Sequence, residues 1–90
     1  MIFYLHIHTQ NAVIFDNEGI DLPNFAAAKA EAIRGARSMM CSEVLVGELD
    51  LDQKIEIHAP ADHCLGTVEF TDALSIRGDR DRVAHRHVNA

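Results

Sequence analysis

The stretch NFAAAKAEAIRGARSMMCSEVLVG, residues 24 to 47, decides the fold because it predicts a single long helix. It contains no proline and is rich in good helix formers. Asn24 is a suitable N-cap, since its side-chain oxygen can accept from a free N–H of the first turn, and Gly47 is placed to end the helix. We expect a helix over residues 25–46. Its apolar stripe, at helical spacing, is expected to comprise Ala26, Ala30, Ile33, Ala36, Met40 and Val44.

Alternating segments predict two strands before this helix and two after it. In residues 2–8, the side chains of Phe3, Leu5 and Ile7 point to one side of a strand, and those of Tyr4, His6 and His8 point to the other. A turn leads to a second short strand, which forms a hairpin with the first. The expected strands are 2–8, 12–15, 54–59 and 65–70.

The element order is therefore β-β-α-β-β, and it restricts the sheet. The helix carries the chain back to the end of the sheet at which the second strand began. The third strand is therefore parallel to the second strand and antiparallel to the first. We expect an α+β fold with a four-stranded antiparallel sheet, in the order 12–15, 2–8, 54–59, 65–70, and the long helix packed on one face. The alternative order places 65–70 beside 2–8.

The domain organisation follows from where the apolar pattern stops. Residues 1–76 are predicted to form one α+β domain, and residues 77–90 a flexible C-terminal tail. A helix of this length spans about 33 Å, whereas a six-residue strand spans about 20 Å. The helix must overhang the sheet, and either Leu49 and Leu51 or a second subunit covers the overhanging end.

Charge and cysteine content limit the classes of partner. The chain has a net charge of −6, and residues 1–76 alone carry −8, which disfavours binding of nucleic acid by the domain. No segment is apolar enough for a membrane span, and the N-terminus does not read as a signal peptide. Cys41 and Cys64 form no C-x-x-C, so we expect a reduced, cytoplasmic protein.

No catalytic motif and no cofactor-binding motif is recognised, so we predict a non-enzymatic module without a cofactor. Homodimerisation is expected through the sheet face that the single helix leaves open or through the overhanging end of the helix. The predicted interface residues are Tyr4, His6, His8, Ile14 and His58.

The same imidazoles allow an alternative function. His6, His8 and His58 lie on the open face if the strand parities hold, and imidazole is a good ligand for zinc. The protein would then be a metal-binding protein or a small enzyme that uses this cluster. The sequence assigns no metal site, because nothing fixes the register and the common chelating spacings are absent.

One set of residues also matches a family pattern. It comprises His6, Asp16-x-Glu18-Gly19-x-x-Leu22-Pro23, Ala28, Glu31, Ala32, Leu49-Asp50, Ile55-Glu56-Ile57 and Phe70-x-Asp72-Ala73. Because of these residues, the chain resembles a family of small alphaproteobacterial, rhizobial-type proteins of unknown function. Proteins of this family carry the motifs Y-F-F-H, D-x-E-G-x-E-L-P and A-x-A-E-A, and the resemblance covers residues 3–76.

The resemblance implies a bacterial origin and supplies no activity. Asp21 stands where the family usually has Glu, and Asn24 where it often has Asp; both substitutions keep the capping chemistry. His8 replaces a position that is often charged, so a site that required His8 would be peculiar to this protein.

Overall fold

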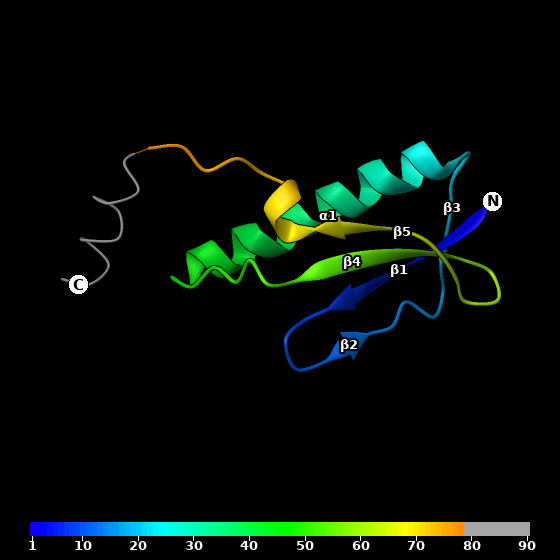
Figure 1. Cartoon of the computed structure of the whole chain (residues 1–90), viewed down its shortest axis with the longest axis horizontal. Helices are drawn as coiled ribbons and strands as arrows, with labels where there is room; N and C mark the ends of the chain where they lie inside the picture. The colour runs from blue at the N-terminus through cyan, green and yellow to red at the C-terminus, as the bar shows by residue number, and fades with distance from the viewer. Residues whose placement is uncertain (79–90) are drawn as a thin grey trace.

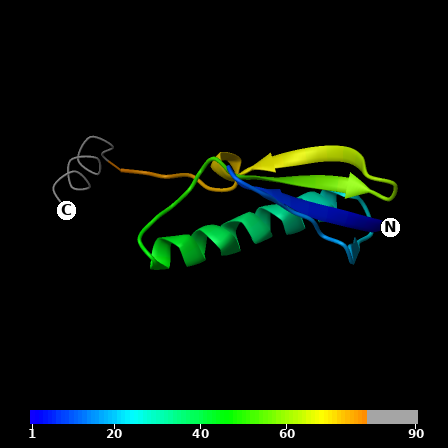
Figure 2. The ribbon, with the colours of Figure 1, turned by 90° about the horizontal axis from the view of Figure 1, so that it is seen from below.

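The computed structural model describes residues 1–78, and its helix and antiparallel sheet form two layers (Figures 1 and 2), which confirms the α+β class. The elements are β1 (Ile2–His8), β2 (Val13–Ile14), β3 (Ile20–Asp21), α1 (Phe25–Leu45), β4 (Lys54–Ala59), β5 (His63–Glu69) and the short 3-10 helix η1 (Phe70–Asp72). Within residues 1–78, no helix has the length and apolar character that a membrane span requires.

The main sheet has the order β2-β1-β4-β5, with antiparallel neighbours throughout, as the sequence predicts. The two-residue strand β3 was not predicted, because a segment this short shows no alternation. It pairs with β1 at Ile2 and Phe3, whereas β2 pairs with β1 at Ile7 and His8. The two short strands therefore occupy opposite ends of β1, and the segment between them must bridge the gap.

The helix begins and ends where the sequence predicts, to within one residue. Asn24 accepts a hydrogen bond from the N–H of Ala27 at 2.9 Å, which caps the first turn. Gly47 has a φ of +86°, and its N–H donates to the carbonyl of Val44. The N–H of Glu48 donates to the carbonyl of Glu43, which completes a Schellman motif.

The predicted apolar stripe of α1 is partly wrong. The residues of α1 that are buried in the structure recur at every fourth position and are Ala28, Ala32, Ala36 and Met40. Ala26, Ala30 and Val44 are exposed. Alanines at three successive turns let the helix backbone approach the sheet closely, and the volume between the layers is filled by Phe3 and Ile57 from the sheet and by Phe70 from η1.

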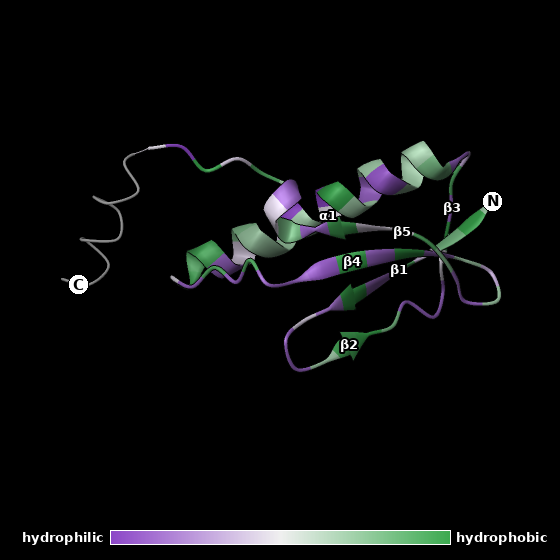
Figure 3. Cartoon of the chain, viewed as in Figure 1, coloured by the Kyte–Doolittle hydropathy of each residue, from purple (hydrophilic) through white to green (hydrophobic). Residues whose placement is uncertain are grey.

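The connecting segment after α1 covers only part of the overhanging end. Glu43 accepts from the N–H of Asp50 at 3.1 Å and from Nε2 of the buried Gln53 at 2.8 Å, so the chain turns back beneath this point. Beyond it, Leu45 and Val46 are 82% and 81% exposed. The helix extends past the sheet in Figure 2, and its last turn is apolar in Figure 3.

After β5, the chain buries Phe70 of η1 and Ala73, the residue that follows η1. The N–H at Nε of Arg37 donates to the carbonyl of Ala73 at 2.6 Å, which ties this segment to the helix. Ile76, the last residue of the predicted domain 1–76, is exposed. Of the predicted tail 77–90, only Arg77 and Gly78 belong to the part that the structure describes.

Candidate functional site

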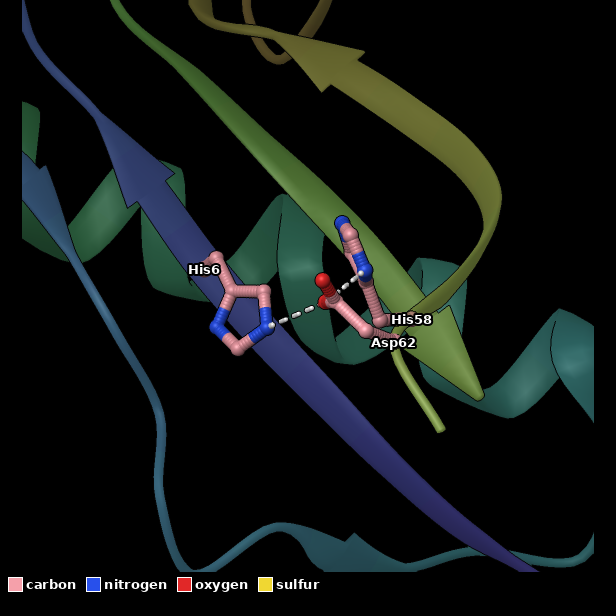
Figure 4. Close-up of side chains that lie close together, drawn as sticks. All are labelled: His6, His58 and Asp62. Atoms are coloured by element: carbon pink, nitrogen blue, oxygen red, sulfur yellow. Dashed lines mark ion pairs between the residues drawn. The ribbon is translucent and has the colours of Figure 1, made fainter. Parts of the chain in front are cut away.

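Three side chains meet on the sheet face that points away from α1, which we call the open face. His6 comes from β1, His58 from β4, and Asp62 from the turn between β4 and β5 (Figure 4). Oδ1 of Asp62 lies 2.9 Å from Nδ1 of His58 and 3.9 Å from Nε2 of His6. One ligand atom from each residue lies within 4.8 Å of the others, so this cluster could hold a metal ion.

The pairing of β1 with β4 brings the two imidazoles together. Tyr4 is opposite His58 and His6 is opposite Glu56, so His6 and His58 are diagonal neighbours on one face. Their ring centroids are 4.6 Å apart. Both residues are buried, with 7% and 8% of their surfaces exposed. Imidazoles that lie this deep depend on protein groups, more than on water, for their hydrogen bonds.

The third member of the cluster sits on an unusual turn. Ala61 and Asp62 have φ values of 68° and 61°, in the left-handed region that side chains other than glycine rarely enter. Aspartate tolerates this conformation, whereas alanine does not enter it readily. The turn places the Asp62 carboxylate over the two rings, with 79% of its side chain exposed. The rim of the site is therefore acidic and wet, and its floor is buried.

His6 is held from the side by the segment that bridges β2 and β3. The N–H of Asp16 donates to Nδ1 of His6 at 3.0 Å. The Asp16 carboxylate accepts from the backbone N–H groups of Leu5, Glu18 and Gly19 at 3.0–3.2 Å. Asp16 therefore fills the gap between the two short strands and satisfies the N–H of Leu5 there.

These bonds also set the charge state of Asp16. Burial alone would raise the pKa of its carboxyl, but the hydrogen bonds from Gly19, Leu5 and Glu18 outweigh that effect and hold the pKa below its usual value. Gly19 is required at the end of the turn. It has a φ of +74°, and a Cβ there would lie 2.7 Å from Cγ2 of Ile2.

Glu56 fixes the other imidazole. Its Oε1 lies 3.0 Å from Nε2 of His58 and 3.0 Å from Nε2 of His8. The hydrogen bond with His58 is the largest cause of the lowered pKa of Glu56; burial opposes it, and the nearby His8 and Lys54 add to the lowering. An ionised carboxylate only accepts, so the proton of a neutral His58 lies on Nε2. Its Nδ1 is buried and makes no well-directed hydrogen bond within residues 1–78, although it lies close to Asp62.

The structure divides the residues that the sequence grouped on the open face. His6 and His58 come together, whereas His8 is half-buried and turned to Glu56. Tyr4 is half-buried and stacks on His6, with centroids 6.4 Å apart.

The placement of Ile14 on the open face is wrong. Ile14 pairs with Ile7, and paired residues share a face, so Ile14 lies on the helix side of the sheet edge. The register is the reason, because the two-residue strand β2 could not be aligned from its sequence. Val13, which pairs with His8, lies on the open face, as does Phe15, whose ring meets the His6 ring edge-on with centroids 5.2 Å apart.

Sequence reasoning missed Asp62, Glu56 and Asp16 as members of the site. Asp62 follows His58 by four residues across a hairpin turn, which was a usable signal, but nothing in the sequence indicates a left-handed alanine.

The pocket at the site has a volume of about 240 Å³ and is lined by Tyr4, His6, Asp16, Asn17 and residues 58–62. A second possible ligand set on the same face, Glu56, His58 and the exposed Cys64, shares His58.

The chain belongs to the family defined by the domain of unknown function DUF6894, whose model matches residues 2–71. The match agrees with the resemblance to a family without an assigned activity; a bacterial origin stays a prediction. No curated protein and no solved structure matches the chain.

Proposed function

We propose that this protein is a non-enzymatic interaction module that forms a homodimer through the open face and the β2 edge of its sheet. One observation carries the proposal: more large apolar side chains are exposed than buried. Within residues 1–78 the large buried ones are Phe3, Met40, Ile55, Ile57, Val68 and Phe70. The exposed ones are Met1, Ile2, Val13, Ile14, Phe15, Phe25, Val44, Leu45, Val46, Leu65 and Ile76.

Six of the exposed apolar residues form two consecutive groups, and the group at the β2 edge fits an interface better. Val13, Ile14 and Phe15 are consecutive and 40–62% exposed, and β2 appears as an apolar strand in Figure 3. Phe15 continues across the open face to His6 and Tyr4 through ring contacts. A continuous surface that combines aromatic rings with an unpaired strand edge is typical of protein interfaces. The other group, Val44 to Val46, is a single helix turn.

A second copy of the chain is the partner that fits this surface. A domain of this size buries little apolar surface, so self-association increases the apolar area that is removed from water. The open face also carries both charge signs side by side, with Lys54 3.7 Å from Glu56. A two-fold interface can place each sign of one copy against the opposite sign of the other. A partner with one strong sign of charge would match this face less well.

Sedimentation equilibrium of the full chain tests the proposal. We expect a dimer at micromolar concentration, a monomer for Phe15→Ser, and an unchanged dimer for the matched variant Leu45→Ser, which removes an apolar side chain from the helix end. Circular dichroism should show that both variants are folded. A native monomer, or a dimer that Leu45→Ser breaks and Phe15→Ser does not, would contradict the proposed interface.

A further inference from the structure

We propose that His6, His58 and Asp62 bind a divalent transition-metal ion, with zinc as the best match. The site goes beyond the proposed dimer, because all three residues come from one chain and the interface does not require a metal. It differs from the set expected from the sequence, since Asp62 takes the place of His8.

The donor set matches this class of ion. Two imidazole nitrogens and one carboxylate oxygen are a common three-ligand arrangement for zinc, with the fourth position left for water. Ligand bonds of about 2.0–2.2 Å put neighbouring donor atoms roughly 3.3 Å apart in a tetrahedral site. The distances from Asp62 Oδ1 are 2.9 Å to His58 and 3.9 Å to His6. Shifts of roughly half an ångström would bring these two distances to the tetrahedral spacing, and the ligand nitrogens of His6 and His58 lie within 4.8 Å of each other.

His58 is already arranged as a ligand. Its Nε2–H donates to Glu56, as ligating histidines donate their second ring nitrogen to a carboxylate. The lone pair on Nδ1 is then directed into the site, and Nδ1 is the one buried side-chain polar atom of residues 1–78 without a hydrogen bond. A lone pair that faces a carboxylate oxygen at 2.9 Å is repulsive unless a cation, either a proton on Nδ1 or a metal ion, lies between them. A metal ion at this position removes the repulsion.

The turn that carries Asp62 supports the same assignment. Ala61 and Asp62 hold left-handed backbone conformations at a cost of about 1 kcal/mol or more for the alanine. Backbone strain of this kind is concentrated at functional sites. Its effect here is to aim an exposed carboxylate at two buried rings.

His6 joins the site only if its proton moves. Nδ1 of His6 accepts from the N–H of Asp16, so the proton of the neutral ring lies on Nε2, the atom that faces Asp62. Ligation through Nε2 needs the other tautomer, with the proton on Nδ1, and so breaks the bond from Asp16. No net proton is released in this step. Metal binding should therefore leave the N–H of Asp16 without its hydrogen bond to His6.

Titration of the chelator-treated full chain with Co²⁺ and then Zn²⁺ tests the site. We expect visible absorption typical of four-coordinate Co²⁺, its displacement by one equivalent of Zn²⁺, and no response to Mg²⁺. On Zn²⁺ binding, hydrogen exchange at the Asp16 amide should become faster. Absence of binding, or binding that leaves this amide unchanged, would overturn the three-ligand assignment.

Variants separate this site from its competitors. Asp62→Asn keeps a residue that suits the left-handed turn, so weaker Zn²⁺ binding in that variant, by more than about tenfold, cannot come from unfolding. His6→Ala and His58→Ala should weaken binding at least as much. His8→Ala is the matched imidazole control and should bind as the native chain does.

Two further variants exclude other ligand sets. Cys64→Ser should leave the affinity unchanged, and so should the double variant His85→Ala/His87→Ala, which removes the histidines outside the described residues. Loss of binding in either of them, with native affinity in Asp62→Asn, would overturn the proposal. Sedimentation reports the dimer and the titration reports metal binding, so failure of the metal site is distinguishable from failure of the proposed interface.

Discussion

The two faces of the sheet are built in different ways. The helix face is closed by side chains such as Phe3 and Ile57 packed against alanines of α1, and its stability comes from non-directional burial. The open face is organised around His6, His58 and Glu56, which are held by directional hydrogen bonds at about 3 Å. Apolar packing therefore supplies most of the stability on one face of the sheet, whereas hydrogen bonds on the other face fix the geometry of the site and add a smaller share of the stability.

The largest expected effect comes from a charge placed between α1 and the sheet. Ala32 is fully buried between α1 and the sheet, so Ala32→Asp places an unpaired carboxylate in the core. We expect a loss of more than about 4 kcal/mol, which is comparable with the whole stability of a small domain. Urea unfolding followed by circular dichroism measures it.

The matched control for Ala32→Asp is Ala30→Asp, two residues away on the exposed side of the same helix. Its free energy of unfolding should change by less than about 0.5 kcal/mol. If the two variants were equally stable, the assignment of the buried helix face would be wrong.

A smaller effect is expected from the hydrogen bonds that brace the open face. Asp16→Ala removes the acceptor for the N–H groups of Leu5, Glu18 and Gly19, and should cost about 2 kcal/mol. The thermal midpoint of unfolding reports the loss. Asp52→Ala is the comparison, since exposed Asp52 accepts one side-chain bond, from Gln10, and should change stability little. Equal effects of the two changes would show that Asp16 is not a structural brace.

The smallest effect concerns pH. The pKa of Glu56 is lowered in the folded chain, so as pH falls the unfolded chain takes up this proton first. The stability that Glu56 contributes is therefore present above about pH 4.3, the ordinary value for Glu, and is lost as pH falls through the lower folded value. Glu56→Gln should flatten the decline in the urea midpoint below this pH. Parallel curves for the native chain and the variant would contradict the pairing of Glu56 with His58 and His8.

The fold was predictable because its signals are local. Asn24 and Gly47 mark the ends of the helix by backbone chemistry that depends on a few neighbouring residues. Residues 54–59 alternate clearly, and β4 has these bounds. The face that α1 buries was not predictable in full, because a helix with alanine on several sides can pack through more than one of them.

The site was predictable only in part. The strand order made His6 and His58 neighbours, but His8 and Ile14 were grouped with them by strand parity alone. A pairing register decides which side chains meet, and a two-residue strand such as β2 is too short to reveal it. Asp62 was missed because its position depends on a left-handed turn at Ala61, a residue type that gives no sign of one.

By itself, the sequence determined the α+β class, the limits of the long helix, the antiparallel strand order and the placement of imidazoles opposite the core face. Those features follow from the periodicity of apolar residues and from local capping, which act within a few residues of the chain. Only the tertiary structure decided the register, the helix face and the meeting of His6, His58 and Asp62. These depend on distances between residues far apart in the chain, which packing sets to within an ångström and which no local pattern encodes.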